Sequence, residues 1–344
     1  MADLLRDSPD WLRWTYPRLY ACLVRYLPSF WALLYYTLDH WWMFRTVQLV
    51  RQRWNWLMAR RFLDWVRSKQ PDVIVVTHFF PADVVAAAKR RGWLSARLIV
   101  VVTDLFPHRF WLVPEANAVV VGSHQTQAVC LRRGIQHDRL HLLGIPVRAG
   151  FHAPEERTVV VHKLGLEPSR LTLLIVGGGM GVGPIKELTK RFAALEATRP
   201  NHLQLLVVCG HNRRLQAHLE RLRKASAMPI RIFGFVETIA ELMQGSDVMV
   251  TKAGGLTVME ALALGLPMIF IGTIPGQERF NAHYVASQGA GVIARGLEDA
   301  IHAVLRLFDD PSQRKAMQAK ALALGRPHAA QELVERLIIP YVRG

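Results

Sequence analysis

From residue 71 onward, short unbroken runs of apolar residues alternate with segments that carry apolar residues at helical spacing. The first four runs predict strands at 72–78, 96–104, 117–123 and 139–147. Helices are predicted between them over Pro81–Arg91 and Gln125–Arg133. Apolar runs without polar interruptions are typical of parallel strands that are covered on both faces. The pattern therefore predicts a doubly wound α/β domain that ends near residue 150.

A second set of runs follows a loose polar connection over residues 148–170. Its six apolar segments predict strands within 171–179, 203–210, 230–236, 246–255, 267–272 and 289–294. The chain has 344 residues, which is enough for two domains of ordinary size. We expect an α/β fold of two doubly wound, Rossmann-like domains that face a cleft. Their predicted bounds are 1–150 and 151–325, and a C-terminal helix over 326–344 packs back on the first domain.

The first 70 residues read as helices, and they concentrate aromatic and basic side chains. Eight of the ten tryptophans lie here: Trp11, Trp14, Trp31, Trp41, Trp42, Trp54, Trp56 and Trp65. Arginines are interleaved with them, and the whole chain has a formal net charge of +16. This composition suits the interface of an anionic membrane, although the tryptophans would equally serve as core or as cover for the sheet. Charge alone also admits nucleic-acid binding as a weaker interpretation.

No segment is apolar over the ~20 residues that crossing a bilayer requires. The longest candidate, residues 26–44, is interrupted by Pro28, Asp39 and His40. The three cysteines are scattered without paired spacing, which argues against a disulfide framework and fits a reducing compartment. The sequence has no HExxH, GxSxG or Asp-x-Asp pattern, so we expect no bound metal.

The run LLIVGGGMGVGPIKEL, residues 173–188, opens as a strand and passes through a glycine cluster into a helical segment. Its spacing matches neither the G-x-G-x-x-G dinucleotide pattern nor the Walker A loop, which ends in Gly-Lys-Ser/Thr. Glycines let backbone N–H groups approach an anion closely, and a helix N-terminus adds partial positive charge. The run is therefore a candidate phosphate loop, with a ligand-free turn as the alternative.

A second candidate anion site follows the fourth strand of the second set. Gly254 and Gly255 precede a helix that begins near Thr257, and Lys252 adds a full positive charge. Glu260 lies three residues after Thr257 on the same helix face, where a carboxylate can accept two hydrogen bonds from a vicinal diol such as a ribose. Ligands of such sheets bind at the carboxyl ends of the strands. Five strand ends in this half carry polar residues and glycines, so they predict one site.

The segments TKAGGLTVMEALALGLP and IPGQERFNAHYV resemble the donor site of glycosyltransferase family 28. Five further segments are similar, in order and spacing, to the diacylglycerol glycosyltransferase branch of that family: VVTDLFPHRFWLVPEANAVVVGS, LGIPVRAGF, VGGGMGVGPIKEL, VCGHNRRL and GFVETIAELMQGSDVMVTKAGG. The branch includes plant monogalactosyldiacylglycerol synthase and bacterial processive diacylglycerol glucosyltransferases. The resemblance runs from about residue 70 to 295. It implies a GT-B fold and an inverting, metal-independent transfer of a hexose from UDP-galactose or UDP-glucose to diacylglycerol.

By this resemblance, the second domain would bind the donor. The diphosphate would be held by Gly177, Gly178, Gly179, Gly181, Gly183, Lys252, Ala253, Gly254, Gly255, Leu256 and Thr257. The remaining contacts would come from Phe235 and Val236 at the uracil, Glu260 at the ribose, and Gln277, Glu278 and Asn281 at the sugar hydroxyls. Fixed dipoles and cations would then stabilise the charge that develops on the departing UDP without a metal or other cofactor.

The acceptor would belong to the first domain. Asp104, His108 and Trp111 follow its second strand, and His78 and Pro81 follow its first. A hydroxyl acceptor needs a general base within hydrogen-bond reach. His108 is the candidate base, and Asp104 would orient or replace it. Each of the two could instead be a structural polar residue at a strand end.

Members of this branch begin with a strand and a glycine-rich loop, whose histidine is usually proposed as the acceptor-side base. This sequence opens instead with MADLLRDSPDW, so we expect either a late start or a natural truncation of the first domain. The expected function is synthesis of glycosyldiacylglycerol by a peripheral, monotopic protein at the cytoplasmic face of a membrane, in contact with anionic lipids and not with nucleic acid. The alternatives are a polyprenyl-diphosphate N-acetylglucosaminyltransferase of cell-wall synthesis and a non-catalytic protein that binds UDP-sugar or membrane.

Overall fold

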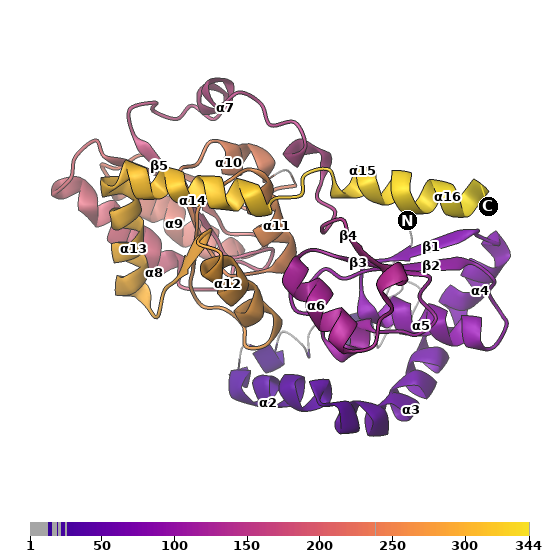
Figure 1. Ribbon diagram of the computed structural model, residues 1–344. Coiled ribbons are helices and arrows are strands. Elements are labelled where there is room, and N and C mark those ends of the chain that lie inside the picture. Colours follow the sequence, from indigo (N-terminus) through magenta and orange to yellow (C-terminus); the bar gives the residue numbers. More distant parts are fainter. Residues whose placement is uncertain (1–12, 16–18, 20–21, 25, 238, 344) are drawn as a thin grey trace. The chain divides into compact units, whose positions relative to one another are not determined.

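A computed structural model describes residues 13–15, 19, 22–24, 26–237 and 239–343, so that Trp11 lies outside the described residues. The chain divides into two compact units. The first comprises Met1–Ile145, Pro275–Gln277 and His328–Gly344, and the second comprises Pro146–Ile274 and Glu278–Pro327. Each unit contains one sheet (Figure 1).

The first unit is built on a parallel sheet with the strand order β1-β2-β3-β4. Its strands are β1 (Val73–Val76), β2 (Arg97–Val101), β3 (Ala118–Val121) and β4 (Leu140–Leu142). Its helices are α2 (Pro28–Asp39), α3 (Trp41–Met58), α4 (Arg60–Lys69), α5 (Phe79–Arg90), α6 (His124–Arg132), α15 (Ala329–Leu333) and α16 (Ile339–Arg343). Short helical turns lie at η1 (Arg109–Trp111), η2 (His137–Arg139) and η5 (Val334–Ile338), the last of which is π-helical.

Both faces of this sheet are covered, as the unbroken apolar runs predict. Leu98 and Val100 of β2 belong to a core cluster that includes Phe62 of α4. The alternate residue Ile99 packs on the other face in a cluster that includes Leu333 near the C-terminus. Because successive side chains of a strand point to opposite faces, one short strand contributes to both cores. Figure 1 shows α15 and α16 running beside the sheet.

The second unit has a parallel sheet with the strand order β10-β9-β8-β5-β6-β7. Its strands are β5 (Leu171–Val176), β6 (Leu203–Val208), β7 (Ile230–Phe233), β8 (Val248–Thr251), β9 (Met268–Phe270) and β10 (Gly291–Ile293). Its helices are α7 (Arg157–Lys163), α8 (Ile185–Ala194), α9 (Arg213–Ala225), α10 (Ala240–Gln244), α11 (Gly255–Ala263), α12 (Gln277–Ser287), α13 (Leu297–Asp309) and α14 (Pro311–Leu324). Short 3₁₀ turns lie at η3 (Ala149–Phe151) and η4 (Leu195–Ala197).

The strand order of the second unit indicates where a ligand would bind at its sheet. From β5 the chain moves outward through β6 to β7, and then returns to the other side of β5 to form β8. The order of strands therefore reverses between β5 and β8, where Val176 pairs with Thr251. Loops diverge at such a switch point and leave room for a ligand outside the carboxyl ends of the strands. Both candidate anion loops follow these two strands.

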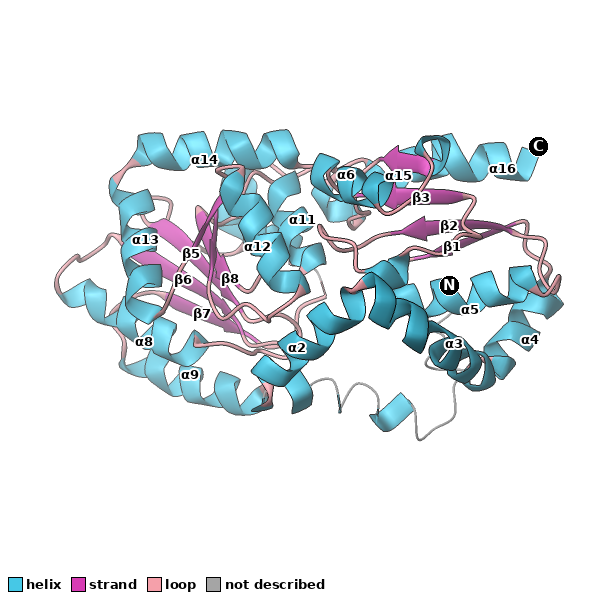
Figure 2. Cartoon of the chain, turned by 60° about the horizontal axis from the view of Figure 1, so that its bottom comes forward, coloured by secondary structure: helices cyan, strands magenta, loops and turns pink. Residues whose placement is uncertain are grey.

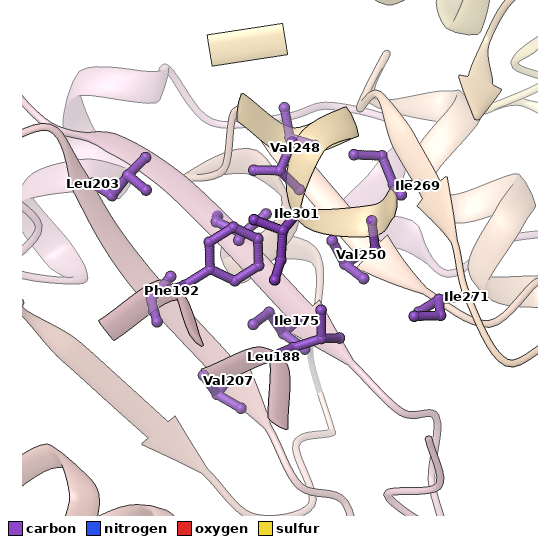
Figure 3. Packing of buried hydrophobic residues seen from close by; sticks show 14 of the residues in the cluster. Ile175, Leu188, Phe192, Leu203, Val207, Val248, Val250, Ile269, Ile271 and Ile301 are labelled. Atoms are coloured by element: carbon purple, nitrogen blue, oxygen red, sulfur yellow. The ribbon is translucent and has the colours of Figure 1, made fainter. Parts of the chain in front are cut away.

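A closely packed core fixes the strands that carry these loops. Phe192 of α8 and Ile301 of α13 pack against Ile175 of β5 and Val250 of β8, and all four are nearly inaccessible to solvent (Figure 3). Helices α8, α9 and α13 lie along this side of the sheet (Figure 2). The loops after β5 and β8 thus start from a rigid base.

Two segments differ from the local sequence pattern: the connection between the sheets and the apolar stretch near the N-terminus. The connection over 148–170 was expected to be a loose polar segment, but it contains the helix α7. Its run of β-branched residues disfavours a helix, yet Val160 and Val161 bury their side chains there, and this packing outweighs the intrinsic preference. The apolar stretch at 26–44 divides into α2 and α3 at His40. Within the described ranges, no helix has the length and apolar character needed to cross a membrane.

Candidate donor and acceptor sites

The glycine loop after β5 folds into a tight turn that only glycine can form at several positions. Gly178 and Gly181 have φ angles of +69° and +58°. The N–H of Gly181 donates to the carbonyl of Gly178 at 3.0 Å, and that of Val182 donates to the carbonyl of Gly177 at 3.1 Å. A Cβ at Gly181 would lie 2.0 Å from the carbonyl oxygen of Cys209. The glycines are therefore required by the backbone itself, in addition to any ligand.

The turn after β6 supports this loop directly. The backbone N–H of His211 donates to the carbonyl of Gly179 at 2.9 Å, and the Asn212 side chain donates to the carbonyl of Gly181 at 3.4 Å. Gly210 comes so close that a Cβ there would lie 2.3 Å from the oxygen of Gly179. Two glycine-containing turns thus pack backbone against backbone at the carboxyl edge of the sheet.

The loop after β8 supplies the second anion-binding element. Gly254 is the N-cap of α11, and no side chain caps the first turn of that helix. Uncapped backbone N–H groups at a helix start favour an anion. Ala253 is buried, and its carbonyl accepts a hydrogen bond of 3.0 Å from Asn281 of α12. Leu256 is half exposed in the first turn of α11, where Thr257 also lies.

Lys252 connects the two anion loops. Its ammonium group lies 2.6 Å from a carboxylate oxygen of Glu278. Its Cε atom is 2.9 Å from the position that a Cβ would occupy at Gly178, so the side chain lies over the glycine loop. The predicted cation and the predicted phosphate loop are therefore neighbours in the second unit.

Glu260 occupies α11 in a half-buried position, and burial raises its pKa to about 7. The Arg148 guanidinium partly opposes this rise. A carboxylate with such a pKa changes its protonation near neutral pH, so its capacity to accept two hydrogen bonds depends on pH there. Arg148 was not among the predicted site residues, because it lies far from Glu260 in sequence and outside the glycine motifs.

Phe235, predicted at the uracil, is exposed at the end of β7, and Val236 beside it is half-buried. The Phe235 ring stacks in parallel on His211, with centroids 4.2 Å apart and an interplanar angle of 9°. His211 was not predicted as a site residue. The stack forms a flat aromatic surface at the same sheet edge as the anion loops, which suits a planar base.

The first unit contains a cavity of about 280 Å³ at the carboxyl ends of β1 and β2. It is lined by Trp31, Leu34, Tyr35, Leu38, His78, Phe79, Asp104, His108, Phe110, Trp111 and Gln277. Most of these side chains are apolar or aromatic, and few polar groups face the space. Such a pocket suits a largely apolar ligand that carries one polar group. The predicted acceptor residues His78, Asp104, His108 and Trp111 all line it, whereas Pro81 lies in the first turn of α5 and does not.

His108, predicted as the general base, is buried with both ring nitrogens engaged. Nδ1 accepts a hydrogen bond from the N–H of Phe110 at 3.2 Å, and Nε2 lies 3.2 Å from the carbonyl oxygen of Tyr35. A carbonyl only accepts, so we assign the proton to Nε2. Burial lowers the pKa of His108 to about 4, against the opposing effect of Asp39. This neutral imidazole has no lone pair left for an acceptor proton, so the geometry speaks against the predicted role.

His78 shows the same arrangement. Its Nδ1 accepts from the N–H of Phe80 at 3.2 Å and caps α5. His78 is exposed, yet desolvation by the surrounding protein lowers its pKa. In the neutral ring the proton then sits on Nε2, which can donate but not accept. Asp104 differs, because its Oδ2 accepts from the indole N–H of the buried Trp111 at 3.1 Å and its carboxylate can take further protons or donors.

An ion-pair network holds the wall of this pocket. Arg133, the residue after the last residue of α6, donates to both carboxylate oxygens of Asp39, at 2.9 and 2.6 Å, and also to the carbonyl of Pro107. The backbone N–H of Arg109 adds a bond of 2.8 Å to Asp39. Asp39 ends α2, so this network ties α2 to the segment that carries His108. Sequence reasoning missed it, because its members lie 70 and 94 positions apart.

Helices α2 and α3 present an apolar surface to solvent, with Phe30, Leu33, Tyr36, Trp41, Trp42 and Trp54 all 40% exposed or more. We call these six residues the α2–α3 surface. Arg45 and Arg53 are exposed on α3 among them. Trp31 and Trp56 are partly buried, so some of the tryptophans pack within the protein while others face solvent. In the part of the chain that the structure describes, no three His, Cys, Asp or Glu side chains gather as metal ligands would.

Comparisons with known proteins agree with this geometry. Residues 1–147 match the family model of monogalactosyldiacylglycerol (MGDG) synthase, and residues 172–333 match that of the glycosyltransferase family 28 C-terminal domain. A processive diacylglycerol beta-glucosyltransferase of Bacillus cytotoxicus is 31% identical over 280 residues, which cover 81% of this chain and 70% of that protein. The enzyme of the same name from Bacillus pumilus is 29% identical over 311 residues, with coverages of 90% and 78%.

Solved structures share the fold. MurG of Acinetobacter baumannii superposes with a TM-score of 0.59 at 18% identity, covering 83% of this chain and 78% of its own. The MnaA–UDP co-structure from S. aureus has a TM-score of 0.62 at 14% identity, with coverages of 82% and 79%. The fold is therefore the GT-B fold, as predicted. The chain belongs to glycosyltransferase family 28, in its diacylglycerol glycosyltransferase branch.

Proposed function

We propose that this protein transfers a hexose from a UDP-sugar to the hydroxyl of diacylglycerol with inversion at the anomeric carbon. The observation that carries the proposal is the pair of anion-binding loops at the switch point of the second sheet, bridged by Lys252. Family membership and the names of the relatives support the same reaction. A polyprenyl-linked N-acetylglucosaminyltransferase is not favoured, because the relatives reported above from the comparison of sequences are named diacylglycerol glucosyltransferases.

In the proposed reaction, the acceptor oxygen forms a bond to the anomeric carbon while the bond from that carbon to the diphosphate breaks. The electron pair leaves with UDP, and the acceptor proton passes to a base. We assign the base to Asp104, because Nδ1 of both nearby histidines is occupied by a backbone N–H. The second unit stabilises the leaving UDP through the loop after β5, the start of α11 and Lys252, without a metal ion.

The donor contacts follow the same assignment. Gly177, Gly178, Gly179, Gly181, Gly183 and the segment Lys252–Thr257 hold the diphosphate, and Phe235 and Val236 meet the uracil. Glu260 binds the ribose diol, and Gln277 reads the sugar hydroxyls, whereas the side chain of Asn281 is fully buried and holds the carbonyl of Ala253. The experiment that tests the donor compares UDP-glucose with UDP-galactose at equal concentration, with diacylglycerol in vesicles and the lipid product identified. Glycosyldiacylglycerol formed from either donor supports the proposal, and its absence with both, while UDP still binds, favours a non-catalytic binding protein.

Glu260 gives the donor site a pH dependence. Glu260→Ala should weaken UDP binding at pH 8 by roughly 1.5–3 kcal/mol, the value of a hydrogen bond to a charged group. The pKa of Glu260 is raised to about 7, so wild-type affinity should rise as pH increases through 7 and the carboxylate forms. The phosphate of UDP also titrates near pH 6, and the Glu260→Ala variant measures that contribution alone. If the affinity for UDP depended on pH in the same way in the wild type and in Glu260→Ala, Glu260 would not be the residue that binds the ribose.

The same pKa has a consequence for stability. In the unfolded chain Glu260 titrates near its ordinary pKa of 4.5, whereas in the folded protein it holds its proton up to about pH 7. The contribution of Glu260 to the free energy of unfolding is therefore fully present below pH 4.5 and is lost as pH rises through 7. Thermal unfolding of Glu260→Gln should lack this part of the wild-type pH dependence.

We further propose that the protein lies at the cytoplasmic face of an anionic membrane through the α2–α3 surface. Exposed aromatic rings beside arginines suit the interface between headgroups and acyl chains. Replacing Trp41 and Trp42 together by alanine should weaken binding to anionic vesicles by roughly 30-fold, if each ring is half-buried in the interface. Added salt should weaken wild-type binding as well. The control is Leu322→Ala, at a similarly exposed apolar residue of the second unit. If neither the double Trp41/Trp42 substitution nor added salt weakens binding to vesicles, the protein attaches to the membrane through another surface.

A further inference from the structure

Glu278 is deeply buried, and both of its carboxylate oxygens are engaged within the protein. Only 4% of the residue is exposed. Oε1 accepts from the Lys252 ammonium at 2.6 Å, and Oε2 accepts from the backbone N–H of Ile274 at 2.9 Å. A sugar hydroxyl would have to reach a buried group whose charge is already balanced. The contacts of Glu278 with Lys252 and Ile274 therefore suggest a role other than the predicted binding of the sugar.

Lys252 is the group through which Glu278 reaches the anion site. Its side chain is 24% exposed, and its Nζ atom lies 3.8 Å from the position of a Cβ at Gly178. The ammonium group thus lies near both the Glu278 carboxylate and the glycine loop. Asn281, one helical turn after Glu278, holds the carbonyl of Ala253 and so fixes the backbone next to Lys252.

We propose that Glu278 is a positioning residue that holds the Lys252 ammonium over the glycine loop, balances its charge, and shares it with the donor diphosphate when UDP-sugar binds. This inference rests on the proposed function and changes the role of one residue in it. A buried carboxylate requires a cation, and a lysine side chain requires a fixed partner to occupy one position. The pair meets both requirements. Glu278 then acts on the diphosphate through Lys252, and the sugar is read by other side chains.

The charge of Glu278 sets the direction of the expected effect. The Glu278 carboxylate occupies part of the lysine charge that would otherwise face the diphosphate. Glu278→Gln should therefore bind UDP more tightly, by roughly tenfold, because the whole charge of Lys252 then faces the diphosphate. Turnover should fall at the same time, because Lys252 loses its fixed position and the product UDP is released more slowly.

Titration calorimetry with UDP and with UDP-glucose, without acceptor, separates the two roles. The proteins compared are the wild type, Glu278→Gln, Lys252→Gln and the double variant. In Glu278→Gln the affinities for UDP and UDP-glucose should increase by the same factor, and this increase should vanish in the Lys252→Gln background. The matched control is Glu241→Gln, which removes the exposed Lys163–Glu241 pair, also 2.6 Å long, in the same unit. It should leave both affinities unchanged.

Two results with the Glu278→Gln variant would overturn the inference. One is an unchanged affinity of Glu278→Gln for UDP together with weaker binding of UDP-glucose, which defines a sugar-reading residue. The other is an effect of Glu278→Gln that persists in full without Lys252. If the single variant does not fold, the double variant, which has no unpaired buried charge, should lose affinity for UDP and UDP-glucose by the same factor, and a larger loss for UDP-glucose overturns the inference. Failure of the proposed function itself would look different, since wild-type protein would then bind neither ligand or bind both without transfer.

Discussion

Asp104→Asn should lower the turnover number for glycosyl transfer by roughly 10²–10⁴, the contribution of a positioned general base. Asparagine has nearly the same shape, and its carbonyl oxygen can still accept from the indole N–H of Trp111, which Asp104 binds at 3.1 Å. The pocket wall therefore stays in place while the proton acceptor is lost. The affinity for UDP should not change, because Asp104 is not among the residues assigned to UDP.

Two further variants make this prediction specific. Asp72→Asn removes an exposed carboxylate of the same unit and should leave turnover unchanged. His108→Gln should destabilise the protein, because the His108 ring joins the N–H of Phe110 to the carbonyl of Tyr35. Any activity that remains in His108→Gln should keep the pH profile of the wild type. A nearly normal turnover in Asp104→Asn would show that another group takes the acceptor proton.

Gly181→Ala should unfold the donor loop and abolish UDP binding. Gly181 has a φ angle of +58°, and an added Cβ would lie 2.0 Å from the backbone oxygen of Cys209 and 3.0 Å from the Cβ of Asn212. A backbone atom at that distance cannot move aside as a flexible side chain would. Strain and overpacking together should cost about 2–5 kcal/mol, which lowers the melting temperature by roughly 5–15 °C.

The neighbouring glycine provides a matched control for stability. Gly179 has no positive φ angle, and a Cβ there would meet no atom within 4 Å. Gly179→Ala should therefore melt at the wild-type temperature. If Gly181→Ala were as stable as Gly179→Ala, the contact between the turns after β5 and β6 would not exist in solution.

Much of the fold was predictable from the pattern of apolar runs. Every run that was interpreted as a strand contains one, from β1 within 72–78 to β10 within 289–294. Unbroken apolar runs have one physical cause, burial of both faces, and Ile99 and Val100 in their separate clusters show it directly. The helix α7 was missed because its β-branched residues are stabilised by packing, which a local pattern does not contain.

The donor loops were predictable because their backbone conformation requires glycine at several positions. Only glycine suits the positive φ angles of Gly178 and Gly181 and the close approach to Cys209, so the sequence shows a cluster of glycines there. The residues that contact these loops have no comparable pattern in the sequence. The stack of His211 on Phe235 and the proximity of Arg148 to Glu260 depend on which strand ends are adjacent, and only the strand order decides that.

The roles of His78 and His108 could be assigned only from the geometry of their hydrogen bonds. His78 and His108 follow strands at positions where a general base is expected, and the sequence gives no information about their tautomers. In the structure each uses Nδ1 to cap a helical turn, so the residue type alone was an ambiguous signal. The same limit applies to Glu278, whose position was predicted while its pairing with Lys252 was not.

The most direct test of the central claim follows labelled hexose from UDP-glucose or UDP-galactose into lipid. Purified protein is incubated with anionic vesicles that contain diacylglycerol, in the presence of a chelator for divalent metals. We expect labelled glycosyldiacylglycerol with the inverted anomeric configuration, and one UDP released for each hexose transferred. Tight UDP binding without any labelled lipid, or transfer that stops completely on chelation, would contradict this claim.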